Sequence, residues 1–302
     1  MIGGFYNWHL AMQGEFKLYP AVRDNLKNFD IYFIGMSRPE LEGCTVSQIR
    51  QRIGDDPKRK IVVCVDYSIE IWAGTLNLPL LEQELLRSDF VFISEPAMIS
   101  HIRALVNDKI PVHHIPHPSN IEAISKFAKP TNARTDEIVA LIHRYDNNWI
   151  APYLVTKDIP WGTHAVCLDG GLEKHLYGQF RYIRQGCEFM EFLEWTSRKR
   201  CVVDSYHKIH SYGRSAVDCA AIKVPIVGTT WTWAQQYLWP DLTVEPGDVW
   251  KQRQLVERLM TDQTFYEEVI DKASKLVNVF SYENKRNELL SKLYPNEVAN
   301  AK

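Results

Sequence analysis

The sequence has little that would mark a membrane protein, a secreted protein or a polyanion-binding protein. No apolar run approaches the roughly 20 residues that span a bilayer, and the first residues lack the basic segment and unbroken apolar core of a signal peptide. Lysine and arginine number 35 against 37 aspartate and glutamate residues, which gives a formal net charge of -2. With 45% hydrophobic and 24% charged residues over 302 positions, we expect a globular, cytoplasmic protein.

The sequence also lacks the spacings of common disulfide and metal sites. Its six cysteines are scattered and include no Cys-x-x-Cys pair, which favours reduced thiols. Three histidines lie close together, at positions 113, 114 and 117. Because Pro116 and Pro118 exclude a helix there, the spacing of His113 and His117 does not put two ligands on one helix face. We therefore expect no metal site.

Short β-branched or aromatic runs alternate with helical patterns along the first half of the chain. The runs that predict strands are 30–34, 60–65, 89–94 and 112–115. Helical spacing of apolar residues occurs between them, over 78–88 and 97–106. Strands that alternate with helices indicate βαβ units and a mainly parallel sheet.

The second half repeats this architecture. Its predicted strands are 137–142, 165–168, 200–203 and 224–227, and helical patterns fill the chain from position 247 onward. The polar segment 125–136 contains a proline and is interpreted as a linker. We expect an α/β protein with two Rossmann-like domains, 1–128 and 129–280, whose mainly parallel sheets face a cleft, and a C-terminal helix, 281–302, that crosses back onto the first domain. In such sheets ligands bind at the carboxyl ends of the strands.

The stretch from His210 to Thr230, HSYGRSAVDCAAIKVPIVGTT, predicts a loop, a short helix of small residues and a strand. Backbone N–H groups at a helix start suit a phosphate. Arg214 and Ser215 add side-chain donors at that position. Asp218 lies one turn further along, where a carboxylate can accept hydrogen bonds from both hydroxyl groups of a sugar diol.

This stretch resembles the donor-site signature of the GT-B glycosyltransferases, especially the large retaining group whose two acidic residues are separated by seven positions. Tyr212 and Gly213 match the aromatic-glycine pair of that pattern, and Asp218 stands at the second acid. His210 replaces the first acid, and Val224 replaces the glycine before the proline. The resemblance implies that His210 lies beside the transferred sugar and that Asp218 holds the nucleotide ribose.

Two other segments resemble the same family. Residues 112–120, VHHIPHPSN, resemble the strand and loop that end its first, acceptor-side domain. Residues 137–144 resemble the strand that opens its nucleotide-sugar-binding domain, which implies that Arg144 contacts the donor diphosphate. The lysine that usually follows that arginine is missing, and 146–149 (DNNW) occupy its place.

The resemblance implies a glycosyltransferase that uses a nucleotide sugar such as a UDP-sugar as co-substrate. The acceptor remains open between a small molecule, a glycan and a nucleic acid. Because the sequence contains no Asp-x-Asp, we expect a metal-independent reaction with no cofactor. The expected donor-binding residues are Arg144, Ser211, Tyr212, Gly213, Arg214, Ser215 and Asp218. The expected catalytic residues are His210 and Asp66; Asp66 directly follows strand 60–65 and would deprotonate the acceptor in an inverting enzyme or orient it in a retaining one.

Three alternatives fit the same features. A glycosyltransferase that modifies bases in DNA is one, since 174–184, KHLYGQFRYIR, interleaves basic and aromatic residues, although a solvated helix face is the favoured explanation of that stretch. A nucleotide-sugar epimerase of the same architecture is another, and it needs a pair of acids around the sugar. A non-catalytic nucleotide-sugar- or glycan-binding module is the third, and the replacement at His210 together with the missing lysine favours it.

Overall fold

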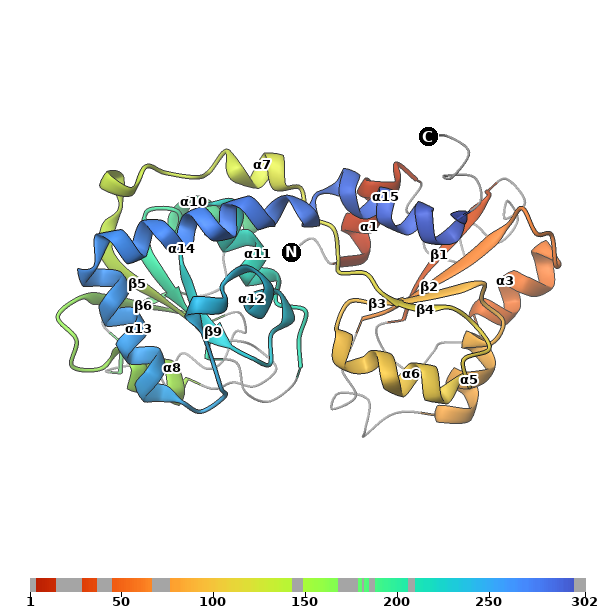
Figure 1. Cartoon of the computed structure of the whole chain (residues 1–302), viewed down its shortest axis with the longest axis horizontal. Coiled ribbons are helices and arrows are strands. Elements are labelled where there is room, and N and C mark those ends of the chain that lie inside the picture. Colours follow the sequence, from red (N-terminus) through yellow and green to blue (C-terminus); the bar gives the residue numbers. More distant parts are fainter. Residues whose placement is uncertain are drawn as a thin grey trace. The chain divides into compact units, whose positions relative to one another are not determined.

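The structure is a computed structural model. It describes residues 4–14, 29–36, 45–66, 77–142, 149–167, 179–180, 182–184, 188–205 and 210–295. These residues form two compact units. The N-terminal unit contains the described residues up to Pro118 together with those from Tyr282 onward, and the inserted unit contains residues 119–281. Each unit is built on a parallel sheet with helices (Figure 1), so the predicted α/β class is confirmed.

The N-terminal unit has a four-stranded parallel sheet in the order β1-β2-β3-β4. Its strands are β1 (Ile31–Met36), β2 (Lys60–Val65), β3 (Phe90–Ile93) and β4 (Val112–His114). Alternate residues of β2 face opposite sides: Val63 packs in the core that contains Leu81 and Leu85, and Cys64 packs in the core that contains Trp8. A strand covered on both faces has to be apolar throughout, which explains the unbroken run that made it predictable.

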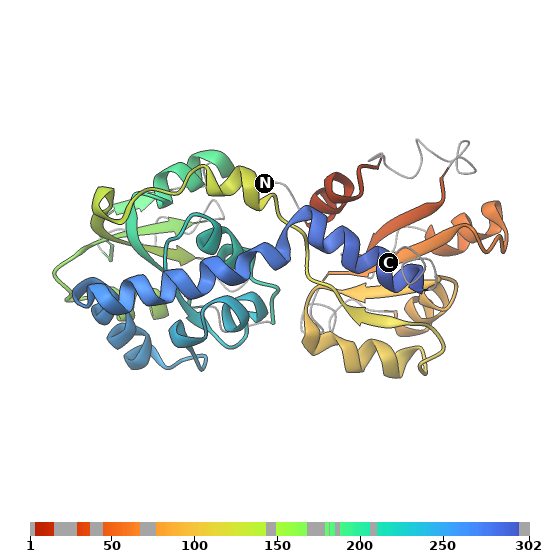
Figure 2. The same ribbon diagram turned by 45° about the horizontal axis from the view of Figure 1, so that its top comes forward.

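Helices cover both faces of this sheet. They are α1 (Gly4–Met12), α3 (Thr45–Ile53), α5 (Leu78–Leu85), α6 (Ile99–Leu105) and α15 (Tyr282–Leu293), with the 3-10 turn η2 (Pro96–Met98) before α6. The last helix, α15, packs on α1 (Figure 2): Leu289 and Trp8 share one core, and Tyr282 Oη donates to Asn7 Oδ1 over 2.9 Å. This is the return of the last helix that the sequence predicts. No helix among the described residues is long and apolar enough to cross a membrane.

The inserted unit has a six-stranded parallel sheet in the order β10-β9-β8-β5-β6-β7. Its strands are β5 (Thr135–Ile142), β6 (Gly162–Cys167), β7 (Tyr182–Arg184), β8 (Lys199–Val203), β9 (Ile226–Thr229) and β10 (Thr243–Val244). Strands β5 and β8 are neighbours. From β5 the chain order continues to β6 and β7 on one side, and from β8 it continues to β9 and β10 on the other. In open parallel sheets the crevice beyond the carboxyl ends at such a reversal is the usual ligand site.

The helices of the inserted unit complete it on both sides of the sheet. They are α7 (Ile121–Ser125), α8 (Ile150–Thr156), α10 (Phe189–Thr196), α11 (Arg214–Ala221), α12 (Trp233–Leu238), α13 (Val249–Thr261) and α14 (Gln263–Leu276), with the 3-10 turns η3 (Thr131–Ala133), η4 (Pro240–Leu242) and η5 (Val277–Phe280). Asp248 accepts from Lys251 N over 3.0 Å and caps α13.

The inserted unit begins at Ser119 rather than at 129. Helix α7 belongs to it because Ile121 and Ile124 are buried in its core and the helix packs on α11. The polar segment that follows is not a linker, since it lies inside this unit. Arg134 fixes it in place by donating to the Lys223 carbonyl over 2.6 Å and to Tyr266 Oη. Hydrogen bonds to a distant carbonyl leave no local sequence pattern, so the polar composition alone does not distinguish this segment from a linker.

The end of the basic and aromatic stretch is a strand rather than a helix face. Residues 182–184 form β7 at the edge of the sheet, and 174–178 and 181 lie outside the described residues. The ring of Tyr182 stacks on His164, with centroids 4.4 Å apart, and Arg184 pairs with Glu191. Part of the basic and aromatic pattern therefore serves packing along an edge strand.

Glu137, on β5, is surrounded by hydrogen-bond donors from its own strand and from both neighbouring strands. His164 Nε2 lies 2.9 Å from one of its carboxylate oxygens, and Lys199 Nζ and Thr135 Oγ1 bond the other. Burial raises the pKa of Glu137, but the hydrogen bonds from Lys199, His164 and Thr135 outweigh it and lower the pKa to about 2. The ionised carboxylate thus ties β6 and β8 to the central strand β5.

We expect Glu137→Gln to lower the free energy of unfolding by about 3 kcal/mol near neutral pH, at about 1.36 kcal/mol per pKa unit. The pKa lies below its ordinary 4.5 in the folded chain, so this stabilisation is complete above that pH and is lost as the pH falls toward 2. Urea unfolding of wild type and variant across this range measures it. The control is Glu194→Gln, because Glu194 pairs with Arg198 at the surface and contributes little. Equal stability of wild type and Glu137→Gln at neutral pH would contradict the prediction.

Candidate functional site

The start of helix α11 depends on the backbone of Gly213. This residue has φ +83° and ψ +56°, in the left-handed region, and no side chain caps the helix start. A Cβ atom at this position would lie 1.9 Å from Thr232 Cγ2, so no larger residue fits without movement. The glycine therefore turns the chain into α11 and leaves the first backbone N–H groups of the helix at the carboxyl-end side of the sheet.

The loop before α11 is held along the loop that follows β9. Ser211 N donates to the Trp231 carbonyl over 2.9 Å, and Trp233 N donates to the Ser211 carbonyl over 3.0 Å. One residue further along, Ala234 N donates to the Tyr212 carbonyl over 3.0 Å. These bonds bring the ring of His210 onto Trp231, stacked with centroids 4.8 Å apart and planes 12° apart. The predicted site histidine thus has a defined orientation, which is set by its stacking on Trp231.

Asp218 lies in the second turn of α11 and is 4% exposed. Its Oδ2 is 3.4 Å from Arg214 Nε, and its Oδ1 has no hydrogen-bond partner among the described residues. Burial raises the pKa of Asp218 to about 6, and the opposing effect of Arg214 does not offset it. A buried acceptor without a partner is costly. Hydroxyl groups of a ligand would supply the missing donors.

Arg214 and Ser215 occupy the first turn of the same helix. The guanidinium of Arg214 lies over the ring of Phe189, 4.9 Å from its centroid, which fixes the side chain between that ring and Asp218. The positive end of the helix dipole and the backbone N–H groups are at this turn. The arrangement can bind an anion and a diol within one helical turn of each other.

Two polar residues that no sequence motif indicates follow β8 at the strand reversal. Asp204 is 5% exposed, and its N–H donates to the Val227 carbonyl over 2.8 Å. Ser205 Oγ donates to Gln252 Oε1 over 2.8 Å. Burial and then the charges of Asp218 and Asp204 raise the pKa of Cys219, so both carboxylates are near that thiol. Their position directly after a strand is the same signal that selected Asp66, and it could have selected them.

One loop and one helix bring together the predicted catalytic residue His210 and the predicted donor-binding residues 211–215 and Asp218. Arg144 lies outside the described residues, in the segment that follows β5. The second predicted catalytic residue, Asp66, belongs to the N-terminal unit.

Asp66 lies at the carboxyl edge of the N-terminal sheet in a cluster of polar side chains. In the parallel register Val65 pairs with Ile93 and Ile93 pairs with His114, so the residues that follow β2, β3 and β4 meet at this edge. Ser94 Oγ donates to Asp66 Oδ1 over 3.1 Å, and His117 Nε2 forms a hydrogen bond with the same oxygen. His114 Nε2 lies 3.2 Å from the Ser94 carbonyl, and burial lowers the pKa of His114.

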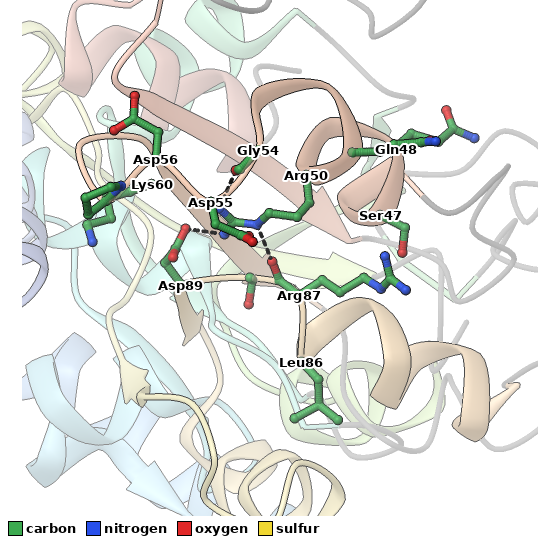
Figure 3. Close-up of a pocket in the computed structure, with 13 residues that line it drawn as sticks. Ser47, Gln48, Arg50, Gly54, Asp55, Asp56, Lys60, Leu86, Arg87 and Asp89 are labelled. Atoms are coloured by element: carbon green, nitrogen blue, oxygen red, sulfur yellow. Dashed lines mark hydrogen bonds and ion pairs between the residues drawn. The ribbon is translucent and has the colours of Figure 1, made fainter.

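A groove at the opposite, amino edge of this sheet does not have the chemistry of a site. Figure 3 shows Arg50 in its centre, near the residues that precede β2 and β3. Arg50 donates to the carbonyls of Arg87 and Gly54 and forms an ion pair with Asp89 over 2.6 Å. Because the guanidinium is used to join α3 to neighbouring loops, it is not available to a ligand.

The described residues contain no group of three or more histidine, cysteine, aspartate or glutamate side chains arranged to hold a metal ion. Three buried thiols, those of Cys64, Cys201 and Cys219, are unpaired as disulfides, and burial raises the pKa of each. These cysteines are therefore core residues rather than nucleophiles.

Solved structures are similar to this chain over most of its length, whereas the sequence matches no protein-family model and no curated protein. An α-glucosyltransferase in complex with UDP and a 13-mer DNA containing an HMU base is 12% identical, with TM-score 0.66 and 91% of this chain and 82% of that chain covered. Sucrose-phosphate synthase from Thermosynechococcus elongatus is 17% identical, with TM-score 0.67 and 93% and 77% covered. The α,α-trehalose 6-phosphate synthase from Burkholderia multivorans is 12% identical, with TM-score 0.69 and 99% and 75% covered. The chain therefore has the fold of the GT-B glycosyltransferases.

Proposed function

We propose that the protein is a metal-independent glycosyltransferase that takes a sugar from a nucleotide-sugar donor. The observation that carries the proposal is the Asp218 carboxylate, buried one turn inside a helix whose start suits a phosphate, with one oxygen unpartnered among the described residues. A nucleotide sugar offers both missing partners, because its ribose hydroxyls donate to the carboxylate and its diphosphate accepts from the helix start.

Each donor-site residue has a role in this proposal. Asp218 accepts from the ribose hydroxyls, and Arg214, Ser215 and the first N–H groups of α11 stabilise the diphosphate as it leaves. Arg144 is proposed to add a second positive charge there. His210, held on Trp231, lies beside the sugar.

The acceptor is proposed to lose its proton to Asp66. The acceptor oxygen forms a bond to the anomeric carbon while its proton goes to the carboxylate. The bond from that carbon to the diphosphate oxygen breaks, and its electron pair leaves with the diphosphate. No metal or cofactor takes part in this step.

Similar structures suggest what to test first as donor and acceptor. UDP is bound in the DNA-bound α-glucosyltransferase, and two of the other similar proteins are named as sugar-phosphate synthases. We therefore propose a UDP-sugar donor and two acceptor classes for direct comparison, sugar phosphates and DNA that contains an HMU base.

A thermal-shift experiment with UDP-glucose, GDP-mannose and ADP-glucose tests the donor. A donor at 100 times its Kd stabilises the fold by about 2.7 kcal/mol, which corresponds to a rise in Tm of roughly 5 to 10 °C for a unit of this size. We expect one nucleotide series to give this rise and to be hydrolysed slowly without acceptor. A rise without any release of nucleotide, with or without the acceptors, would favour a binding module. No rise with any of them would contradict the proposed function.

A further inference from the structure

The Asp66 carboxylate is asymmetric in its hydrogen bonding. Its Oδ1 contacts both Ser94 Oγ and His117 Nε2. No bond to its Oδ2 is formed by the described part of the chain, and the side chain is 23% exposed. One oxygen is therefore held by the protein, and the other is left to accept from a molecule in solution.

His117 is placed to donate rather than to react. A carboxylate oxygen only accepts, so Nε2 of His117 carries the hydrogen that it shares with Asp66. The side chain of His117 is 5% exposed, compared with 23% for Asp66, so the carboxylate and not the imidazole can reach a substrate.

The chain around His117 holds the backbone of this residue in place. Ile115 continues the strand pairing by donating to the Ile93 carbonyl over 3.1 Å, and it is fully buried. Pro116 and Pro118 follow on either side of His117, and a residue before a proline is restricted to extended backbone. The two prolines that exclude a helical metal site thus fix the position of this histidine.

We propose that His117 is the positioning residue for Asp66: its Nε2–H holds Oδ1, so that Oδ2 faces the acceptor hydroxyl and takes its proton. The inference rests on the proposed function, because it assigns a role within the same transfer. Because two donors occupy Oδ1, Oδ2 is the carboxylate oxygen that accepts the proton. Ser94 assists as the second donor to Oδ1.

Four variants separate positioning from general packing. His117→Leu keeps an apolar body of similar size and removes the donor, whereas His117→Gln keeps an N–H near the position of Nε2. Ser94→Ala removes only the second donor. His113→Leu is the matched control, because His113 lies on β4, shortly before His117, and stacks on Phe90, with centroids 5.0 Å apart, instead of contacting Asp66.

Steady-state nucleotide release with the donor that stabilises the wild type gives kcat and KM for each variant. We expect His117→Leu to lower kcat about 10- to 100-fold with KM for the donor within about twofold, and His117→Gln to stay within about threefold of wild type. Ser94→Ala should lower kcat less than His117→Leu, and His113→Leu should match wild type. Wild-type kcat in His117→Leu would overturn the inference, as would a His117→Gln variant as slow as His117→Leu.

A spectroscopic measurement covers the case in which His117→Leu does not fold. With histidine labelled by 15N, we expect a low-field Nε2–H resonance that is absent in His117→Gln and moves upfield in Asp66→Asn. Absence of that resonance in the wild type would overturn the inference. The proposed function fails in a different way, because a wild-type chain that neither binds nor hydrolyses any of the three donors overturns both.

Discussion

Asp218→Asn is expected to weaken nucleotide-sugar binding about 100-fold while making the unliganded protein more stable. Binding weakens because hydrogen bonds to a charged acceptor contribute about 1.5 to 3 kcal/mol and the neutral amide accepts less strongly. Stability rises because the variant no longer buries a charged carboxylate with one oxygen that has no partner among the described residues. A substitution that weakens ligand binding and raises the stability of the unliganded protein identifies a residue whose role is to bind the ligand.

The raised pKa of Asp218 makes the folded protein less stable as the pH rises. The pKa of Asp218 is raised from 3.8 to about 6 in the folded chain, so the folded state binds its proton more tightly than the unfolded state. Wild type therefore loses stability as the pH rises from about 4 to about 6, by at most about 3 kcal/mol, and Asp218→Asn does not.

Chemical unfolding of the apo protein at several pH values and donor titration by calorimetry measure the two effects. Asp271→Asn is the control, since Asp271 is exposed on α14 and pairs with Lys275 in the next turn. Asp218→Asn with wild-type affinity for the donor would remove Asp218 from the site. A loss of stability in the apo variant would show instead that the carboxylate is structural.

Gly213→Ala is expected to destabilise the inserted unit by about 3 kcal/mol or more and to abolish donor binding. Left-handed backbone costs a residue with a Cβ about 1 to 2 kcal/mol, and crowding in a packed region costs about 1 to 3 kcal/mol. The crowding here is severe, because the new Cβ would lie 1.9 Å from Thr232 Cγ2, and Thr232 is 5% exposed. Movement of either loop would also separate His210 from Trp231.

Gly247→Ala separates the two causes. Gly247 has φ +86°, and a Cβ there would meet nothing within 4 Å, so this variant reports the backbone cost alone. In the double variant Gly213→Ala/Thr232→Ser the clashing methyl is gone, and we expect its stability loss to approach that of Gly247→Ala. Thermal unfolding measures all three, at roughly 2 to 4 °C per kcal/mol. Equal losses for Gly213→Ala and Gly247→Ala would contradict the steric explanation.

The strands that could be predicted are those buried on both faces. Residues 60–65 form an apolar run with no alternation, and the structure places a strand there with the predicted bounds. The strand at 182–184 was missed because it is three residues long, lies at a sheet edge and carries a tyrosine that is 41% exposed. Local sequence contains no pattern for such a strand, since its partner β6 supplies the pairing.

The candidate site was predictable to the extent that it is continuous in sequence. The segment 210–218 contains its own turn, helix start and carboxylate, so its residue types indicate its chemistry. The contact between Asp66 and His117 joins residues that are 51 positions apart, and only the register of three parallel strands brings them to one edge. The stacking of His210 on Trp231 likewise depends on hydrogen bonds between two loops.

The inserted unit interrupts the N-terminal unit, and its two ends are tied together. Ser119 N donates to the Phe280 carbonyl over 2.8 Å, and Ser119 pairs with Ser281 in a bridge. During synthesis on the ribosome, residues 119–281 emerge before α15, whereas α1 waits for α15 to cover Trp8. The inserted unit can therefore complete its fold first. Because its two ends adjoin, it is the part of the chain that is suited to expression on its own, to circular permutation or to exchange between proteins.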